Sequence, residues 1–251
     1  MTDARDTFGK KSDAYAVFRP RYPIALYEWL LAHCPGRAAA WDCATGNGQA
    51  AVDLARYFKV VHASDISVEQ VAHGEKRPNI VYAPGAAEKT DYPDELFDLV
   101  TVAQALHWFD YERFWPEAAR VSKPGALFCA WGYAWFDCDP DVERRLVRPF
   151  RALIEPFWAR NNAILWRGYG NADIHFPYRR LQTPAFAIEV KWTLPQLIAY
   201  MQTWSAYKRS QEDDRTATKL ASIVEEAEKE FAGRPPLSIA MPLKMVAGYI
   251  E

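Results

Sequence analysis

The sequence predicts an α/β fold, a doubly wound and mostly parallel sheet with helices on both faces. Two observations support this prediction. Short apolar segments alternate along the chain with segments of helical periodicity, which is the pattern of parallel sheets. The stretch AAWDCATGNGQAAVDLA, residues 39–55, also joins a buried strand to a helix through a glycine-rich turn. A chain of 251 residues is long enough for one large domain of this kind.

Five strands are expected in the first part of the chain, and the first is apolar enough to be covered on both faces. They are 38–44, 60–66, 80–85, 96–104 and 126–132. A turn at Lys123-Pro124-Gly125 precedes the fifth strand. Helices between consecutive strands require right-handed crossovers, so we expect these strands to run parallel.

Three helices are expected to connect these strands, and their starts carry recognisable signals. The first helix covers 49–57 and begins directly after the glycine-rich turn. A short second helix follows Ser67, which forms a capping box with Gln70. The third helix covers 111–121 and follows Asp110 as its N-cap residue.

The alternation of strands and helices breaks down beyond residue 136. The expected elements are a helix over about 140–160, a loop rich in glycine, proline and aromatic residues, a strand at 185–192, helices over 194–209 and 216–232, and a last strand over 237–250. Thr193 and Gln196 form a capping box before the helix over 194–209. Pro242 is expected where the last strand needs no N–H for the sheet.

The chain is interpreted as a single domain over 1–251, because it contains no internal repeat, low-complexity tract or linker. Residues of about 1–36 are expected to form an N-terminal cover over the ligand site. Residues of about 137–184 are expected to form an insertion within the same domain, since they interrupt the strand–helix rhythm.

Composition and charge argue against several classes of protein. The formal net charge is −2 and the isoelectric point is about 6.2, so no nucleic-acid partner is expected. No apolar run approaches the roughly 20 residues that span a bilayer, so no membrane partner is expected. The cysteines form no C-x-x-C pair and the histidines no H-x-x-x-H pair, which argues against a metal site. A cytoplasmic protein, monomeric or weakly dimeric, is the expectation.

The glycine-rich turn and the acid before it indicate an adenosine cofactor. Gly46, Gly48 and Ala51 fit the G-x-G-x-x-G/A pattern, in which the pyrophosphate of NAD lies at a helix N-terminus. Asp42, however, lies just before the turn, at the carboxyl end of the strand expected over 38–44, and its carboxylate would repel a pyrophosphate. S-adenosylmethionine carries an ammonium group, a sulfonium and hydroxyls but no phosphate, so Asp42 favours it over NAD. An aspartate that only caps the turn is the structural alternative.

Asp65 is a second candidate cofactor ligand. It ends the second strand at the spacing expected for an acid that binds a ribose diol. NAD and S-adenosylmethionine both have that diol, so Asp65 does not distinguish between them. A charge-assisted hydrogen bond of this kind contributes about 1.5–3 kcal/mol. Ile66, the next residue, is expected to cover the adenine face.

Several segments resemble motifs of the class I S-adenosylmethionine-dependent methyltransferases. They are DCATGNG at 42–48, SDIS at 64–67, GAAE at 85–88, FDLVTVAQALHWFD at 97–110 and KPGALF at 123–128. YAVFRPRYP at 15–23 and AQALHWF at 103–109 are similar to a methyltransferase-11-type branch, which includes trans-aconitate methyltransferase-like proteins. The resemblance covers nearly the whole chain.

The resemblance implies a seven-stranded, Rossmann-like sheet whose seventh strand is antiparallel, with S-adenosylmethionine as cofactor. The cofactor neighbours that it implies are Asp42, Ala44, Gly46, Gly48, Asp65, Ala87 and Gln104. Two positions depart from the family pattern. Ala44 replaces the first glycine of the motif, and its methyl group narrows the space through which a ligand approaches the backbone there. Ala86 replaces an aspartate often found in relatives, so a backbone group must accept from the adenine amino group.

The chemistry is expected at the end of the fourth strand, which is Gln104, because ligands bind outside the carboxyl ends of such strands. His107 is the candidate catalytic residue, as a general base or as a group that orients the acceptor. A buried histidine bonded to the backbone is the alternative. The candidate substrate-binding residues are Tyr15, Arg19, Tyr22, Trp108 and Tyr169. Arg19 can hold an acidic acceptor through a bidentate contact.

The predicted function is in-line methyl transfer to a small organic acceptor, with a carboxylic acid among the candidates. No N/D-P-P-Y sequence follows the fourth strand, which argues against an enzyme that modifies nucleic-acid bases. Two alternatives stay open. One is a nicotinamide-dependent oxidoreductase, which only the glycine spacing supports. The other is a protein that binds S-adenosylmethionine without catalysis, because methyl transfer has no obligatory catalytic residue.

Overall fold

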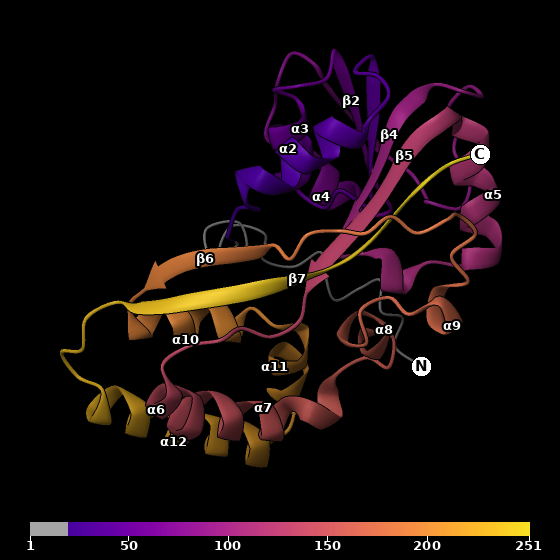
Figure 1. The fold of residues 1–251 in the computed structure, drawn as a ribbon. Helices are drawn as coiled ribbons and strands as arrows, with labels where there is room; N and C mark the ends of the chain where they lie inside the picture. Colours follow the sequence, from indigo (N-terminus) through magenta and orange to yellow (C-terminus); the bar gives the residue numbers. More distant parts are fainter. Residues whose placement is uncertain (1–19) are drawn as a thin grey trace.

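The computed structural model describes residues 20–251, which form a seven-stranded sheet in the order β3-β2-β1-β4-β5-β7-β6 (Figure 1). The strands are β1 Ala39–Cys43, β2 Val60–Asp65, β3 Ile80–Pro84, β4 Phe97–Ala103, β5 Ser122–Tyr133, β6 Ala187–Trp192 and β7 Leu237–Tyr249. β1 to β5 pair in parallel, and β7 runs antiparallel between β5 and β6. The doubly wound sheet and its antiparallel seventh strand confirm the predicted fold.

Helices cover both faces of this sheet and extend beyond it. They are α2 Ile24–His33, α3 Gln49–Leu54, α4 Val68–Ala72, α5 Tyr111–Val121, α6 Pro140–Val142, α7 Arg148–Ile154, α8 Asn162–Trp166, α9 Asn171–Ile174, α10 Leu194–Gln202, α11 Ser205–Ser210 and α12 Asp214–Glu230. Short 3₁₀ turns lie at Leu106–Trp108 and Glu155–Phe157, and a π-helical turn at Glu143–Val147.

The core divides into two clusters because side chains alternate between the faces of a strand. Along β5, Leu127, Cys129 and Trp131 belong to the cluster that also contains buried apolar residues of α2 and α3. Phe128 and Ala130 belong to the other cluster, together with the buried residues of α5 and α9. The sheet is therefore covered on both faces, as its continuous apolar strands predict.

The predicted helix starts are capped in three different ways. Thr193 and Gln196 form both bonds of a capping box. The Ser67 hydroxyl accepts the Gln70 N–H at 3.3 Å, which is one half of the box expected there. Asp110 occupies the N-cap position of α5, but its side chain makes no capping hydrogen bond.

β7 changes partner along its length. Its first half pairs with β6 up to Pro242, which lies opposite Ala187, and its second half pairs with β5 from Leu243, which lies opposite Tyr133. The Leu243 N–H donates to the Phe186 carbonyl at 2.8 Å. Pro242 is exposed and sits at this change of partner, where a missing N–H is tolerated.

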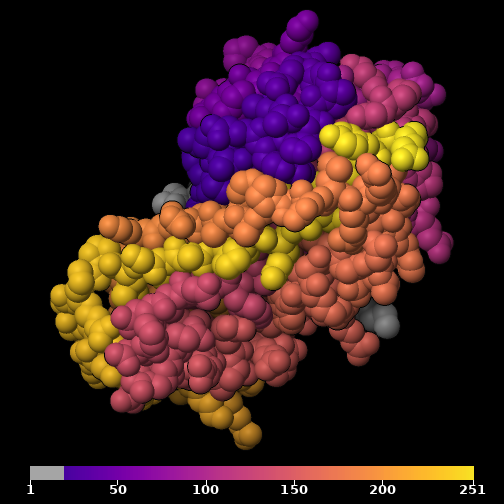
Figure 2. Space-filling view, viewed as in Figure 1, coloured from indigo at the N-terminus to yellow at the C-terminus, as the bar shows by residue number. Residues whose placement is uncertain are grey.

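A helical layer packs against the β6–β7 end of the sheet. In Figure 1, α6, α7, α10, α11 and α12 lie beneath these two strands. Figure 2 shows β6 and β7 as a band between the indigo strand–helix half and the pink to gold helices. The buried side chains of the layer, such as Phe150, Met201 and Leu220, continue the α2–α3 core cluster. Segments distant in sequence thus build one cover beside the carboxyl edge of the sheet.

Two of the helices expected in this layer are interrupted. The helix expected over 140–160 contains a π-helical turn at 143–147 directly before Pro149, whose ring nitrogen cannot donate to the carbonyl one turn earlier. The helix expected over 194–209 breaks at Thr203 and Trp204, where Trp204 adopts an extended backbone. That break turns the Trp204 side chain, which is 8% exposed, into the aromatic cluster described below. The loop expected after residue 160 contains α8 and α9.

The Lys123-Pro124-Gly125 segment lies within β5, and the expectation of a separate turn was wrong. A register shift between Phe97 and Leu99 of β4 absorbs this irregular stretch. Gly125 has φ of +80°, and its N–H donates to the Ile250 carbonyl at 2.7 Å. Pairing with the residue that follows β7, the neighbour of β5 on the side away from β4, therefore keeps these residues in the strand.

Candidate active site

The carboxyl ends of β1, β2 and β4 bring three predicted cofactor residues to one edge of the sheet. Asp42 of β1 pairs in register with Ala63 of β2 and with Thr101 of β4. Asp65 ends β2, and Gln104 directly follows β4. Ligands of doubly wound sheets bind outside this edge, so the three residues lie where a cofactor is expected.

The turn after β1 has the backbone conformation that a close approach to a ligand requires. Ala44, Gly46 and Gly48 have φ values of +53°, +57° and +88°. A Cβ at Gly48 would lie 2.1 Å from the Tyr82 hydroxyl, so a side chain there forces a rearrangement. Ala44 occupies the left-handed region with a Cβ, which strains the backbone at the position where the family motif has glycine.

Asp42 is completely buried, with 0% of its surface exposed. Its Oδ1 accepts the Thr101 hydroxyl at 2.9 Å, and its Oδ2 accepts the Thr45 hydroxyl. Burial raises the pKa of Asp42 to about 6, although these hydrogen bonds act in the opposite direction. The carboxyl therefore titrates close to neutral pH, and a positively charged ligand nearby would favour its ionised form.

Asp65 holds the glycine turn against the end of β2. Its Oδ2 accepts the Gly46 N–H at 2.8 Å, and its Oδ1 accepts the Ser67 N–H at 2.9 Å. A carboxylate has about four acceptor sites, so these bonds leave capacity for two ribose hydroxyls. Next to it, Ile66 is 58% exposed, so its apolar side chain is accessible to a ligand at this edge.

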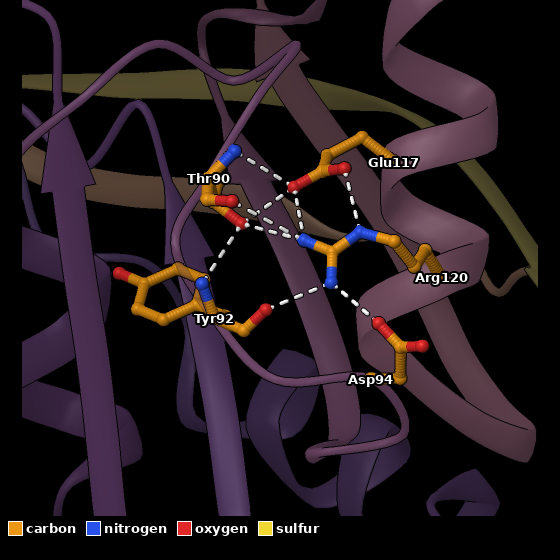
Figure 3. Close-up of polar contacts among 5 residues, drawn as sticks. All are labelled: Thr90, Tyr92, Asp94, Glu117 and Arg120. Atoms are coloured by element: carbon orange, nitrogen blue, oxygen red, sulfur yellow. Dashed lines mark hydrogen bonds and ion pairs between the residues drawn. The ribbon is translucent and has the colours of Figure 1, made fainter.

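A network of charged residues fixes the segment between β3 and β4 (Figure 3). Arg120 of α5 donates to the Tyr92 carbonyl at 2.8 Å and to Asp94 at 2.6 Å. The guanidinium also donates to both carboxylate oxygens of Glu117, at 2.7 and 3.0 Å. Glu117 in turn accepts the backbone N–H and the hydroxyl of Thr90, at 2.7 and 2.6 Å.

This network lies immediately after the GAAE segment at 85–88, where the adenine of the cofactor is expected. Ala87 is 8% exposed, and the Glu88 carboxylate accepts the Asp110 N–H at 3.1 Å at the start of α5. The segment is thus fastened to α5 at both of its ends. The sequence does not indicate the network, because Thr90 and Arg120 are far apart in the chain and form no motif.

Gln104 links the ends of β4 and β5. Its side-chain amide donates to the Tyr133 carbonyl at 3.1 Å, and its Oε1 accepts the Tyr133 N–H at 3.1 Å. The residue has φ of +60°, a strained conformation that these two bonds and the Gln104 N–H bond to the Trp131 carbonyl at 2.8 Å hold in place. A Cβ at Gly132 would lie 2.5 Å from Gln104 Oε1, so the glycine leaves room for this arrangement.

A cavity of about 130 Å³ opens beside Gln104, between the sheet edge and the helical layer. The residues that line it are Gln104, His107, Trp108, Tyr133, Ala134, Trp158, Asn162, Leu165, Trp166, Tyr200, Thr203, Trp204, Ser205 and Lys208. Gln104 was predicted beside the cofactor, and it also lines this cavity. The cofactor edge and the cavity therefore adjoin at this residue.

His107 lies in the cavity wall and is 3% exposed. Its Nδ1 is 3.5 Å from the Tyr169 hydroxyl, and its carbonyl accepts the Asn161 side-chain N–H at 3.0 Å. Burial lowers the pKa of His107 to about 4, because the interior disfavours the imidazolium. The ring is consequently neutral across the physiological pH range.

Tryptophans from three segments build the wall opposite the sheet. The Trp158 ring packs edge-to-face on Trp166 at 5.6 Å and lies 6.1 Å from Trp204. Trp135 stands behind these rings, 5.8 Å from Trp158 and 5.2 Å from Trp166. Trp135 and Trp158 are not among the residues predicted from the sequence, because only the fold brings 135, 158 and 204 together.

The predicted substrate-binding residues occupy different places. Trp108 lines the cavity. Tyr169 is fully buried, and its hydroxyl contacts His107 in the cavity wall. Tyr22 packs edge-to-face on Trp131 at 5.4 Å and is 6% exposed. Tyr15 and Arg19 lie outside the described residues.

Two further features are absent from residues 20–251. These residues contain no group of three or more histidine, cysteine, aspartate or glutamate side chains that could hold a metal ion. In the same part of the chain, no helix has both the length and the apolar character needed to cross a membrane.

Comparisons with known proteins agree with this arrangement. Residues 41–130 match a family described as a methyltransferase domain, of the methyltransferase-11 type. A Dictyostelium discoideum protein that carries a methyltransferase name is 32% identical over 206 residues, which cover 80% of this chain and 78% of that protein. A solved structure from Anaeromyxobacter dehalogenans, described as a type II methyltransferase, is 35% identical with a TM-score of 0.81. The match covers 93% of this chain and 98% of the chain in that structure.

The strand order, the antiparallel β7 and the glycine turn between two acids define the class of enzymes that bind S-adenosylmethionine at the carboxyl edge of a sheet. The chain belongs to the class I S-adenosylmethionine-dependent methyltransferases, in the methyltransferase-11-type family. The resemblance to the class I methyltransferases is thereby confirmed, and the nicotinamide-dependent oxidoreductase is set aside.

Proposed function

We propose that this methyltransferase binds S-adenosylmethionine across the carboxyl ends of β1, β2 and β4 and methylates a small carboxylic acid held in the adjoining cavity. The observation that carries the proposal is the position of Gln104. It directly follows β4 at the predicted cofactor edge, and it also lines the cavity. A donor at the edge and an acceptor in the cavity would therefore be neighbours.

The residues at the edge fit the cofactor. The Asp65 carboxylate retains acceptor capacity for a ribose diol, and exposed Ile66 offers an apolar surface for the adenine. Asp42, Ala44, Gly46 and Gly48 form a turn with no basic side chain, which suits a ligand that carries positive charge and no phosphate. Ala87 lies in the segment that the Arg120 network fixes.

When bound, S-adenosylmethionine supplies an electrophilic methyl group on a sulfonium. The contribution of the chain is to align the acceptor with that group and to exclude water. The aromatic side chains around the cavity serve both purposes, since they are rigid and leave little room for solvent. Trp108 and His107 belong to the cavity wall that follows Gln104 in the sequence, so we assign them to orienting the acceptor.

A carboxylic acid suits this cavity because it needs no base. Among the described residues that line it, none is aspartate or glutamate. The lowered pKa of His107, about 4, makes its ring a weak proton acceptor at neutral pH. A carboxylate is already ionised there, since its ordinary pKa is about 4. A phenol or an ammonium group would have to lose a proton first.

The remaining expectations concern partners. Tyr15, Arg19, Tyr22 and Tyr169 stay predicted substrate-binding residues, with Arg19 as a bidentate partner for an acid. The slightly acidic chain and the small cavity support a small molecule over a nucleic acid as substrate. A cytoplasmic protein, monomeric or weakly dimeric, remains our expectation.

Release of S-adenosylhomocysteine in the presence of small acids, phenols and amines tests the proposal. We expect turnover with acids and, at saturating S-adenosylmethionine, a rate that stays constant as pH falls through 6.5, because a carboxylate acceptor releases no proton. His107→Gln should retain much of this activity. A steep loss of rate at acid pH that disappears in His107→Gln would show general-base catalysis and overturn the carboxylate assignment. Calorimetry with S-adenosylmethionine and NAD tests the cofactor separately.

A further inference from the structure

Tyr169 follows α8 in a backbone conformation that large residues rarely adopt. Gly168 and Tyr169 have φ values of +78° and +57°, both in the left-handed region. The Tyr169 N–H donates to the Ile164 carbonyl at 3.0 Å, and its carbonyl accepts a hydrogen bond from the Arg180 guanidinium. Arg180 in turn pairs with Gly248 of β7. The fold therefore holds this residue in a costly conformation, and such residues concentrate at functional sites.

The Tyr169 hydroxyl is completely buried and has one hydrogen-bond partner among the described residues, Nδ1 of His107 at 3.5 Å. A Cβ at Gly132 would lie 3.2 Å from this hydroxyl and 2.5 Å from Gln104 Oε1, but that oxygen accepts the Tyr133 N–H. Burial raises the pKa of Tyr169, so the phenol keeps its hydrogen and needs an acceptor for it. His107 Nδ1 can be this acceptor only when it carries no hydrogen itself.

The other ring nitrogen of His107 is accessible from the cavity. Nε2 makes no hydrogen bond within residues 20–251, yet it is not one of the buried polar atoms that lack a partner there. It must therefore have exposed surface, and His107 lines the cavity. Burial lowers the pKa of His107 to about 4, so the neutral ring carries a single hydrogen. With Nδ1 as an acceptor, that hydrogen is on Nε2.

We propose that Tyr169 is a positioning residue, which donates its hydroxyl hydrogen to His107 Nδ1 and thereby fixes the imidazole as an Nε2–H donor at the cavity. This inference rests on the proposed function and adds the residue that sets the form of His107. Tyr169 then serves the methyl acceptor through His107. A ring held in this form donates a hydrogen bond to an oxygen of the acceptor and takes no proton from it, which suits an acceptor that is already ionised.

Nuclear magnetic resonance of the unmodified protein tests the form of the ring without any acceptor. The protein is labelled with nitrogen-15 at histidine, and the spectrum of His107→Gln identifies the His107 signals by their loss. Protonated and unprotonated ring nitrogens resonate at well-separated frequencies. We expect the hydrogen on Nε2 and none on Nδ1 at neutral pH. A hydrogen on Nδ1 would overturn the proposal.

Tyr169→Phe removes the hydroxyl and keeps the ring. We expect the Nδ1 frequency of His107 to change, because its hydrogen bond is lost, while the Kd of S-adenosylhomocysteine stays the same. Tyr178→Phe is the matched control, since Tyr178 packs against the same core cluster and its buried hydroxyl has no partner among the described residues. That variant should leave the Nδ1 frequency unchanged. The same frequency in Tyr169→Phe and the unmodified protein would overturn the role of the hydroxyl.

Turnover shows whether Tyr169 acts through His107. The probes are acetate, succinate and benzoate, with release of S-adenosylhomocysteine as the readout. Tyr169→Phe should lower kcat about threefold, a modest loss because 3.5 Å is long for a hydrogen bond. In the His107→Gln background the same substitution should have no further effect, because the ring that it positions is gone. Equal losses in both backgrounds would overturn the positioning role.

Failure of the proposed function gives a different result. If S-adenosylhomocysteine does not bind, or if none of the acids is methylated, the proposed function fails, and the resonance experiments still decide whether Tyr169 sets the form of His107. If acids are methylated while Nδ1 carries the hydrogen, only this inference fails.

Discussion

The Asp65 carboxylate accepts the Gly46 N–H at 2.8 Å, which fastens the glycine turn after β1 to the end of β2. The same side chain is the predicted partner of the cofactor ribose. One residue thus sets the shape of the turn and offers acceptor sites to the ligand, so its removal should affect both.

Asp65→Ala should weaken S-adenosylhomocysteine binding by about 1.5–3 kcal/mol, a rise in Kd of about 10- to 100-fold. Titration calorimetry measures this change. Glu69→Gln is the control, because Glu69 is an exposed carboxylate of α4 whose loss should leave the Kd nearly unchanged. An unaltered affinity in Asp65→Ala would place the ribose contact elsewhere.

Cofactor affinity should rise with pH through about 6, where Asp42 titrates. A ligand with an ammonium group and a sulfonium favours the ionised carboxyl, so protonation below that pH should reduce its affinity by up to about tenfold per pH unit. Calorimetry from pH 5 to 8 measures the slope. Asp42→Asn cannot titrate, and its affinity should be nearly independent of pH; a slope equal to that of the unmodified protein would contradict the assignment.

Asp42 and His107 should make the free energy of unfolding change with pH in opposite directions. His107 has a pKa of about 4 in the folded chain, below its ordinary value, so the unfolded chain binds the proton first and stability falls as pH drops from about 6.5 to 4. Asp42 has a raised pKa of about 6, so the unfolded chain loses the proton first and stability falls as pH rises from about 4 to 6.

Variants separate these two effects. Relative to the unmodified protein, His107→Gln should gain stability on acidification from pH 6.5 to 4, by up to about 3 kcal/mol. Asp42→Asn should show the opposite trend and gain relative stability as pH rises from 4 to 6. Urea unfolding at half-unit pH intervals measures both. If the stability of both variants depended on pH in the same way as that of the unmodified protein, neither group would have the stated pKa shift.

Glu117→Gln should loosen the segment between β3 and β4. Burial raises the pKa of Glu117, but its hydrogen bonds from Arg120 and Thr90 outweigh burial, and the net pKa lies below the ordinary value. Losing the carboxylate charge should lower the free energy of unfolding by about 1–3 kcal/mol. It should also speed amide hydrogen exchange at residues 86–94.

Glu112→Gln, an exposed change on the same helix, is the control for this variant and should have a small effect. Since the Glu117 pKa is lowered by folding, its stabilisation is present above the ordinary pKa and is lost as pH falls through the folded value. The difference between Glu117→Gln and the unmodified protein should therefore shrink in acid. A difference that is constant with pH would mean that the carboxylate charge is not what holds the segment.

The sequence alone determined the local features of the fold and the cofactor edge. Apolar segments and turn residues located all seven strands, because strand periodicity and turn chemistry depend on neighbouring residues. The placement of Asp42 and Asp65 at strand ends followed from the same local pattern. These residues share one edge because parallel strands all end on the same side of a sheet.

Only the tertiary structure decided how distant segments combine. Trp135, Trp158 and Trp204 meet across the helical layer, and no spacing in the chain indicates that contact. The raised pKa of Asp42 and the lowered pKa of His107 likewise come from burial by several elements at once. Burial depends on everything that packs around a group, whereas sequence patterns report only what lies beside it along the chain. For this protein, the strand ends that carry Asp42 and Asp65 could therefore be predicted from the sequence, whereas the tryptophan-lined cavity was created by the fold.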